Sequence, residues 1–230
     1  MNHPQTDSTK QYQISIPATL RARITLPASK SISNRALILN ALCAQKAQIS
    51  NIAKCDDTDA MVAALQSADD TINIGAAGTA MRFLTAYFAT RQGRTVTLDG
   101  SERMRQRPIG VLVDALRSCG AIIEYAGNEG FPPLRITGTR LSAQVIEIPG
   151  NVSSQYISAL LMISPLIEGC TTMRLSGNII SRPYIDMTLA LMEQFGVKAT
   201  INGNEISLPQ NAAYTARHFV VENDWSAASY

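Results

Sequence analysis

Histidine and tryptophan are scarce in this sequence of 230 residues, and its cysteines are not closely spaced. Its two histidines, His3 and His218, lie near the chain ends, which argues against chemistry centred on an imidazole. The four cysteines lie far apart and form no Cys-x-x-Cys pair; they are Cys43, Cys55, Cys119 and Cys170. This spacing is typical of reduced thiols in a cytosolic protein, and it argues against a disulfide framework or a zinc site.

Long apolar runs and a surplus of one charge are also missing. No stretch approaches the roughly 18 to 20 apolar residues of a membrane span, and the polar start MNHPQTDSTKQYQ lacks the apolar region of a signal peptide. Twenty basic against 18 acidic residues leave a charge of +2, too balanced for a nucleic-acid surface. With 46% hydrophobic residues the chain can still build a core, so we expect a folded cytoplasmic protein.

Three segments begin with small, hydroxyl or glycine residues and then become apolar on every side, which is typical of buried helices. These segments are 28–44, 76–89 and 151–164. Three others are amphipathic and are predicted to be outer helices. They are 56–68, 107–120 and 182–196.

The inner and outer helices recur together. Arg35, Arg82 and Tyr156 occupy matching places in the inner set. The outer set is expected to open at Asp56, Arg107 and Arg182, at nearly the same spacing. Strand-like runs lie between them, residues 14–26 are expected to form two short strands broken at Pro17, and 198–208 reads as a hairpin turning at Asn202–Gly203. We therefore predict an α/β fold of three repeated units, with three buried parallel helices surrounded by sheets and outer helices.

Parallel buried helices would bring their N-termini to one surface, where free N–H groups and a partial positive charge favour anions. The side chains at these starts are hydroxyls, amides and cations that bind phosphate or carboxylate. They are Ser29, Lys30, Ser31 and Arg35; then Ala77, Gly78, Thr79 and Arg82; then Asn151, Ser153, Ser154 and Gln155.

The binding free energies of such groups indicate what kind of ligand the site needs. A helix end contributes about 0.3–1 kcal/mol, whereas micromolar affinity needs about 8 kcal/mol. Charge-assisted bonds must therefore contribute most of the affinity. The candidates for these bonds are Lys30, Arg35, Arg82 and Arg107. We expect a small ligand with more than one anionic group.

Each of these residues also has a purely structural interpretation. Ser31, Thr79 and Ser153 suit helix N-caps, Gly78 suits a turn, and Pro108 makes Arg107 partly structural as a helix start. The basic run from 103 to 107 resembles a solvated face. Acidic residues suit the first turn of an outer helix better than a metal site; they are Asp56, Asp57 and Asp59. The coincidence of three helix starts favours the functional interpretation.

Five motifs together resemble the 5-enolpyruvylshikimate-3-phosphate synthase family, in its order and at its spacing. They are PASKSISNRAL (27–37), GAAGTAMRF (75–83), RMRQRPIG (103–110), GNVSSQY (150–156) and SRPYID (181–186). The resemblance covers nearly all of this chain but only the first half of the family's length. It implies a two-domain enzyme of βαβαββ units, three per domain. It also implies transfer of the enolpyruvyl group of phosphoenolpyruvate to the 5-hydroxyl of shikimate 3-phosphate, with release of phosphate and without metal or organic cofactor.

The family pattern also implies residue roles. Lys30 would contact both substrates as the catalytic residue of this half. Shikimate 3-phosphate would be held by Lys30, Ser31, Arg35, Ser153, Ser154, Ser181 and Tyr184. Phosphoenolpyruvate would be held by Lys30, Gly78, Arg107 and Gln155, with support from Thr79 and Arg82.

The sequence departs from the family pattern in two ways. Ala76 and Phe83 replace an Asn and a Pro beside the phosphoenolpyruvate region, although Gly78 still favours binding of the inhibitor glyphosate. The Lys-Glu motif and catalytic Asp and Glu of the second domain are missing, so we expect substrate binding without turnover. The expected parts are a tail and strand (1–20) belonging partly to the absent domain, a shikimate 3-phosphate-binding domain (21–222) and the start of the crossover (223–230). With that second domain the enzyme is expected to be a monomer.

Three alternatives are weaker. A UDP-sugar enolpyruvyl transferase typically uses a loop cysteine, and the loop from Arg103 to Pro108 has none. A non-catalytic phosphosugar- or anion-binding module would need a complete fold that ends at Tyr230. A nucleic-acid-binding protein would need a basic surplus and an aromatic platform, and both are lacking.

Overall fold

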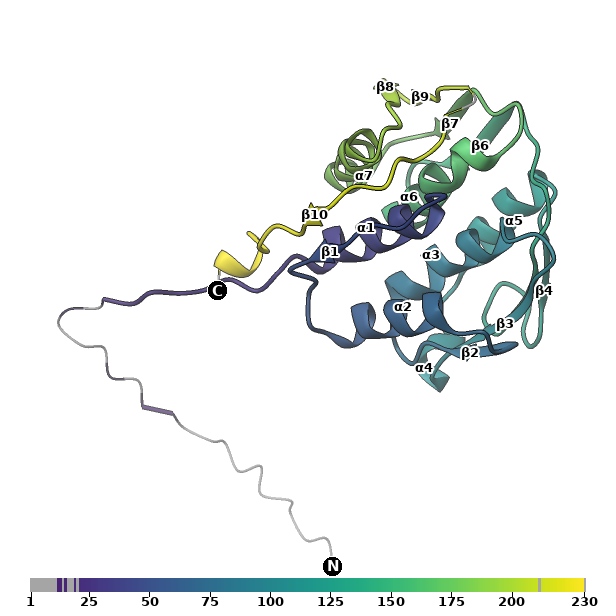
Figure 1. The fold of residues 1–230 in the computed structure, drawn as a ribbon. Coiled ribbons are helices and arrows are strands. Elements are labelled where there is room, and N and C mark those ends of the chain that lie inside the picture. The colour runs from purple at the N-terminus through teal and green to yellow at the C-terminus, as the bar shows by residue number, and fades with distance from the viewer. Residues whose placement is uncertain (1–11, 14, 16–18, 20, 211, 230) are drawn as a thin grey trace, which may run out of the picture.

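The computed structural model describes residues 12, 13, 15, 19, 21–210 and 212–229. Within them it is a mixed α/β protein, as predicted from the sequence. Its inner helices are α1 (Lys30–Leu42), α3 (Gly78–Ala89) and α6 (Ser154–Ile163), which is followed by a 3-10 turn, Ser164–Leu166. Figure 1 shows these three helices side by side in the middle of the molecule. No helix among the described residues is both long and apolar enough to cross a bilayer.

Helices α3 and α6 are buried because apolar residues occupy nearly all of their faces, whereas α1 also buries the polar residues Ser33, Asn34 and Arg35. Every residue of α3 is buried, and in α6 only Gln155 is partly exposed. Ser29 caps α1 by accepting a hydrogen bond from the N–H of Ile32, and Ser153 caps α6 by accepting one from Gln155. Burial of each large apolar side chain here contributes about 1.5–3 kcal/mol, so this trio forms the centre of the core.

The outer helices are α2 (Asp56–Gln66), α5 (Gly110–Ser118) and α7 (Arg182–Gln194). Each buries one face: α2, for example, buries Thr58, Met61 and Ala64, which are spaced for one helical side. Helix α2 packs against α1 and α3, α5 against α6, and α7 against α6 and α1. The outer layer thus packs around the three inner helices.

Two four-stranded sheets share one topology. In the first, β2 (Thr71–Asn73) pairs in parallel with β3 (Thr95–Asp99), followed by antiparallel β5 (Leu134–Thr137) and β4 (Ile122–Tyr125). The second repeats this arrangement. Its strands, in spatial order, are β6 (Val145–Pro149), β7 (Thr172–Ser176), β9 (Glu205–Ser207) and β8 (Thr200–Asn202). Two stretches of the chain thus form sheets with the same strand order and the same pairing directions.

The N-terminal part of the chain differs from these two sheets. Strand β1 (Ile49–Ser50) pairs in parallel with β10 (Phe219–Val220), near the other end of the chain. Residues 21–27 form no strand, and residues 14, 16–18 and 20 of the two predicted strands lie outside the described residues. Nothing local in the sequence indicates this pairing, because its partners lie about 170 residues apart.

Two other predicted boundaries were wrong. The outer helix expected from Arg107 begins at Gly110: Pro108 disfavours helical geometry in Arg107, and the non-helical Ile109, with φ of −142°, is the N-cap. A short helix, α4 (Glu102–Arg105), lies just ahead of it and is capped by Ser101. The hairpin turns at Gly203–Asn204, since Asn202 still pairs with Glu205 and Gly203 takes the positive φ of +57°.

Candidate anion-binding site

The N-termini of the inner helices meet at one cavity of about 300 Å³. It is lined by Lys30, Ser31, Arg35, Thr79, Ser153, Ser154, Gln155 and Tyr184. Helices α1, α3 and α6 each contribute their first turn, and α7 contributes Tyr184. The side-chain amide of Gln155 donates to the hydroxyl of Thr79 over 3.2 Å, which joins α6 to α3 at the cavity wall. The structure therefore brings together three helix starts that lie far apart in the sequence.

Arg35 is a buried cation at this cavity, with 2% of its surface exposed. Its Nη1 donates to the carbonyl of Ser31 over 2.9 Å, and its Cζ lies 5.3 Å from the ring centre of Phe83 and 5.9 Å from that of Tyr184. Burial lowers the pKa of Arg35 to about 10, so it stays charged at neutral pH. No carboxylate of the described residues forms an ion pair with it. An anionic ligand can supply that missing charge.

Lys30 of the cavity wall pairs with a carboxylate of α2 that does not itself line the cavity. The Nζ atom of Lys30 lies 3.7 Å from Oδ2 of Asp57, and Oδ1 of Asp57 accepts from the N–H of Thr79 over 3.4 Å. We expected Asp57 only to stabilise the start of α2. One sequence signal for its second role exists: Ala77, the N-cap of α3, has no side chain that can cap a helix.

Gly78, the first residue of α3, lies against Arg107. A Cβ atom on Gly78 would overlap the guanidinium of Arg107, so this close approach requires glycine. A neighbouring cavity of about 420 Å³ is lined by Ala76, Arg103, Met104 and Arg107. Arg103 was predicted only as part of a solvated face, and here it adds a second guanidinium to this cavity.

Arg82 is buried beside this region and its donors are used by the protein. Its Nη1 donates to the carbonyl of Gly78 over 3.2 Å and its Nη2 to that of Pro108 over 2.8 Å. The hydroxyl of Tyr156 donates to the same Pro108 carbonyl over 2.6 Å. Burial lowers the pKa of Arg82. Arg82 thus braces the loop that carries Arg107, and it does not line either cavity.

Ser181 lies at the N-cap of α7 but not on the wall of the smaller cavity. Its backbone is left-handed, with φ of +57°, and its hydroxyl makes no capping bond. A non-glycine residue in this conformation costs about 1–3 kcal/mol and is often found at functional sites. Four of the predicted site residues do not line this cavity; they are Ser181, Gly78, Arg107 and Arg82.

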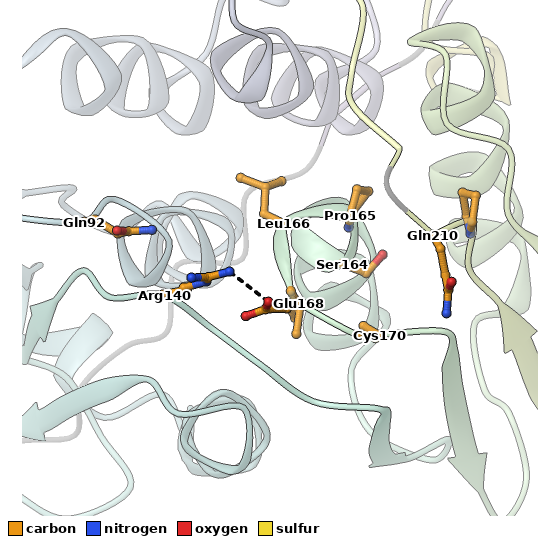
Figure 2. Close-up of a pocket in the computed structure, with 11 residues that line it drawn as sticks. Gln92, Arg140, Ser164, Pro165, Leu166, Glu168, Cys170 and Gln210 are labelled. Carbon is orange, nitrogen blue, oxygen red and sulfur yellow. Dashed lines mark hydrogen bonds and ion pairs between the residues drawn. The ribbon is translucent and has the colours of Figure 1, made fainter.

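Another cavity, of about 410 Å³, lies at the C-terminal ends of α3 and α6 and is shown in Figure 2. It is lined by Gln92, just after α3, and by Ser164 and Leu166, just after α6. Arg140 and Glu168 point toward each other there and form an ion pair of 2.8 Å. Helix C-termini carry partial negative charge, so this cavity suits an anion less well than the one at the helix starts.

Comparison with known proteins gives one consistent family. The family model for EPSP synthase (3-phosphoshikimate 1-carboxyvinyltransferase) matches residues 14–68 and 64–230. The chain is 54% identical over 220 residues to the 3-phosphoshikimate 1-carboxyvinyltransferase of Bacteroides fragilis strain YCH46, covering 96% of this chain and 53% of that protein. It is 43% identical over 235 residues to the protein of the same name from Vibrio atlanticus, covering 90% of this chain and 55% of that one. The chain thus spans about half the length of the curated relatives it matches.

The fold agrees with this family. The EPSP synthase of Acinetobacter baumannii superimposes with a TM-score of 0.78 at 23% identity, covering 90% of this chain and 51% of that one. At such low identity the likeness concerns the fold alone.

Proposed function

Because the chain belongs to the EPSP synthase family, we propose that it forms the shikimate 3-phosphate-binding part of a 3-phosphoshikimate 1-carboxyvinyltransferase. Such an enzyme transfers the enolpyruvyl group of phosphoenolpyruvate to the 5-hydroxyl of shikimate 3-phosphate and releases phosphate. The observation that supports this most is the meeting of three helix starts at a cavity with one lysine and one buried arginine, for which the described residues provide no ion pair.

The chemistry of the cavity matches a ligand with two anionic ends. Arg35 presents a guanidinium fork suited to a carboxylate, with Ser31 beside it. Ser153 and Ser154, at the start of α6, offer hydroxyls and free backbone N–H groups suited to a phosphate. In this proposal Ser181 completes the phosphate contacts, Tyr184 lies beside the ring, and Lys30 reaches both substrates.

The phosphoenolpyruvate side would lie across the start of α3. Arg107 packs against Gly78, and Gln155 is fixed by its bond to Thr79, so two donors face this region from different elements. Arg82 would support Arg107 through the Pro108 carbonyl. Charge-assisted bonds of about 1.5–3 kcal/mol each make two such contacts enough for a weak anion site.

We extend the proposal to the organisation of the chain. Residues 21–222 would form one domain of three βαβαββ units, in which the segment with β1 is the first unit and borrows β10 to complete its pairing. Residues 1–20 and 223–230 would lead to a second domain. The remaining general acid and base would come from that domain, and because each such group contributes about 10²–10⁴-fold, the chain alone would bind without turnover.

Calorimetry with the 230-residue chain tests the binding proposal. Shikimate 3-phosphate should release heat at millimolar concentration, whereas shikimate without the phosphate should bind at least about tenfold more weakly, because one charge-assisted bond is worth that much. Ser154→Ala should weaken binding. Ser164→Ala is the matched control, since Ser164 is also buried but follows the other end of α6.

Two results would contradict the proposal. Absence of heat with shikimate 3-phosphate at millimolar concentration would refute the substrate. Phosphate release from both substrates by the purified chain, with no second domain added, would refute the assignment of the missing acid and base to that domain.

A further inference from the structure

Two buried hydroxyl groups outside the cavity wall accept hydrogen bonds from Arg35. Thr188 of α7 and Ser158 of α6 are both fully buried, and neither lines the cavity. Nε of Arg35 donates to Oγ1 of Thr188 over 2.7 Å, and Nη2 donates to Oγ of Ser158 over 3.0 Å. We propose that Thr188 and Ser158 are positioning residues, which orient the Arg35 guanidinium toward an anionic ligand without touching that ligand themselves.

The hydrogen atoms of this network can be assigned by counting donors. The hydroxyl of Thr188 lies 2.7 Å from the carbonyl of Tyr184, and because a carbonyl only accepts, the single hydrogen of Thr188 points there. The two hydroxyls lie 2.9 Å apart, so Ser158 must be the donor between them. Both oxygens then accept from Arg35, and neither hydroxyl is free to rotate away.

The same count gives the N–H groups of Arg35 that remain for a ligand. A guanidinium has five N–H hydrogens. Each nitrogen of Arg35 donates one of them: Nε to Thr188, Nη1 to the carbonyl of Ser31 and Nη2 to Ser158. Within the described residues, one hydrogen on Nη1 and one on Nη2 therefore remain. These two terminal nitrogens form the fork that pairs with a carboxylate.

The neutrality of these acceptors matters for binding. A carboxylate in place of Thr188 or Ser158 would also orient the guanidinium, but it would cancel its charge and compete with an anionic ligand. Hydroxyls and a carbonyl fix the geometry and leave the full charge for the ligand. Thr188 also ties this network to Tyr184, whose ring lies on the cavity wall beside Arg35.

This inference rests on the proposed function, since the ligand used to test it is shikimate 3-phosphate. The decisive variant is Thr188→Val, which keeps the shape of the side chain but removes its hydroxyl. Thr85→Val is its matched control: Thr85 is also fully buried in a helix and also donates to the carbonyl four residues earlier, that of Met81, over 2.7 Å. Thr85 has no hydrogen bond to Arg35.

We expect Thr188→Val to weaken binding of shikimate 3-phosphate by about tenfold, the effect of one misplaced charge-assisted bond. Thr188→Ser restores the hydroxyl and should restore the affinity, and Thr85→Val should leave it unchanged. Equal affinities of Thr188→Val and Thr85→Val would overturn the inference. Failure of Thr188→Ser to restore binding would overturn it as well.

A second readout does not depend on the ligand. In ¹H–¹⁵N NMR spectra, the Nε–H signal of Arg35 should be protected from exchange in the wild-type chain, in Thr85→Val and in Thr188→Ser, and it should lose protection in Thr188→Val. Protection that survives in Thr188→Val would overturn the inference. A wild-type chain that shows this signal but does not bind shikimate 3-phosphate would refute the proposed function, and with it the role of Thr188 in ligand positioning.

Discussion

The guanidinium of Arg107 takes the place of a side chain on Gly78. A Cβ atom built on Gly78 would lie 2.6 Å from Cζ of Arg107 and 2.7 Å from its Nη2, closer than unbonded atoms approach. Gly78 is the first residue of α3, and its carbonyl also accepts a hydrogen bond from Arg82. The missing side chain therefore decides where one cation of the site can lie.

Gly78→Ala should move Arg107 while leaving the fold intact. The clashing atoms are the far end of a flexible side chain, and alanine is the better helix former by about 1 kcal/mol. We expect a free energy of unfolding within about 1 kcal/mol of wild type. Urea unfolding measures the stability, and a crystal structure of the variant shows the displaced guanidinium. An unmoved Arg107 would contradict this explanation of the glycine.

Gly138→Ala provides the contrast, because the obstacle there is backbone. A Cβ atom on Gly138 would overlap the carbonyl group of Arg91 and would lie 2.9 Å from the carbonyl oxygen of Phe88. Since neither can rotate away, we expect a loss of about 1–3 kcal/mol, the usual cost of overpacking. Urea unfolding of both alanine variants measures the difference. Equal stabilities would show that the backbone moves as easily as the Arg107 side chain.

Asp57→Ala should destabilise the chain more than Asp59→Ala. Both residues lie in the acidic first turn of α2. Only Asp57 accepts a hydrogen bond from the N–H of Thr79, and it does so in place of the N-cap Ala77, whose side chain cannot accept one. The loss of a cap typically costs about 1 kcal/mol. Denaturant unfolding of the two variants should show this extra loss. Equal midpoints would mean that the 3.4 Å contact contributes nothing.

The pair of Asp99 and Arg105 predicts a pH dependence. The side chain of Arg105 donates to both carboxylate oxygens of Asp99, over 3.0 and 2.6 Å, and this lowers the pKa of Asp99, with a further contribution from the N–H of Gly100. A lowered pKa in the folded state means that the stabilisation is fully present above about pH 4 and is lost as the pH falls through the folded-state value.

Asp99→Asn should therefore reduce the free energy of unfolding at pH 7 and have progressively less effect toward pH 3. Unfolding curves of both proteins across this range measure the difference. Adding Arg105→Gln to Asp99→Asn should cause little further loss, because the two residues act as one pair. A difference that grows as the pH falls would have the wrong sign and would contradict the assignment.

Thiol labelling should separate Cys55 from the other cysteines. Cys43, Cys119 and Cys170 are 7%, 1% and 4% exposed, and burial raises the pKa of each thiol, that of Cys170 to about 11. Cys55 is only half-buried. A chromogenic disulfide reagent should find one fast thiol in the native chain and four in urea. Cys55→Ser should abolish the fast phase; a fast phase that persists would mean that a buried thiol is accessible.

Most elements of this fold could be predicted from local sequence patterns. The all-round apolar segments became the buried helices α1, α3 and α6, and the amphipathic ones became outer helices, because hydrophobic periodicity depends only on neighbouring residues. The helix start at Gly110 differs from the predicted start at Arg107, because Pro108 disfavours helical geometry in the residue before it and Ile109 forms the N-cap. The pairing of β1 with β10 gave no local signal, since its partners are brought together by the rest of the chain.

The sequence by itself determined which residues stand at the three helix starts, and it placed Lys30, Thr79 and Ser153 there because helix type and helix start are set within a few residues. Only the tertiary structure decided what those residues meet. Asp57 lies against Lys30, Arg107 fills the space at Gly78, and Thr188 with Ser158 orients Arg35. Each of these contacts joins residues from different elements of the fold, so it depends on how those elements pack, which no stretch of neighbouring residues specifies.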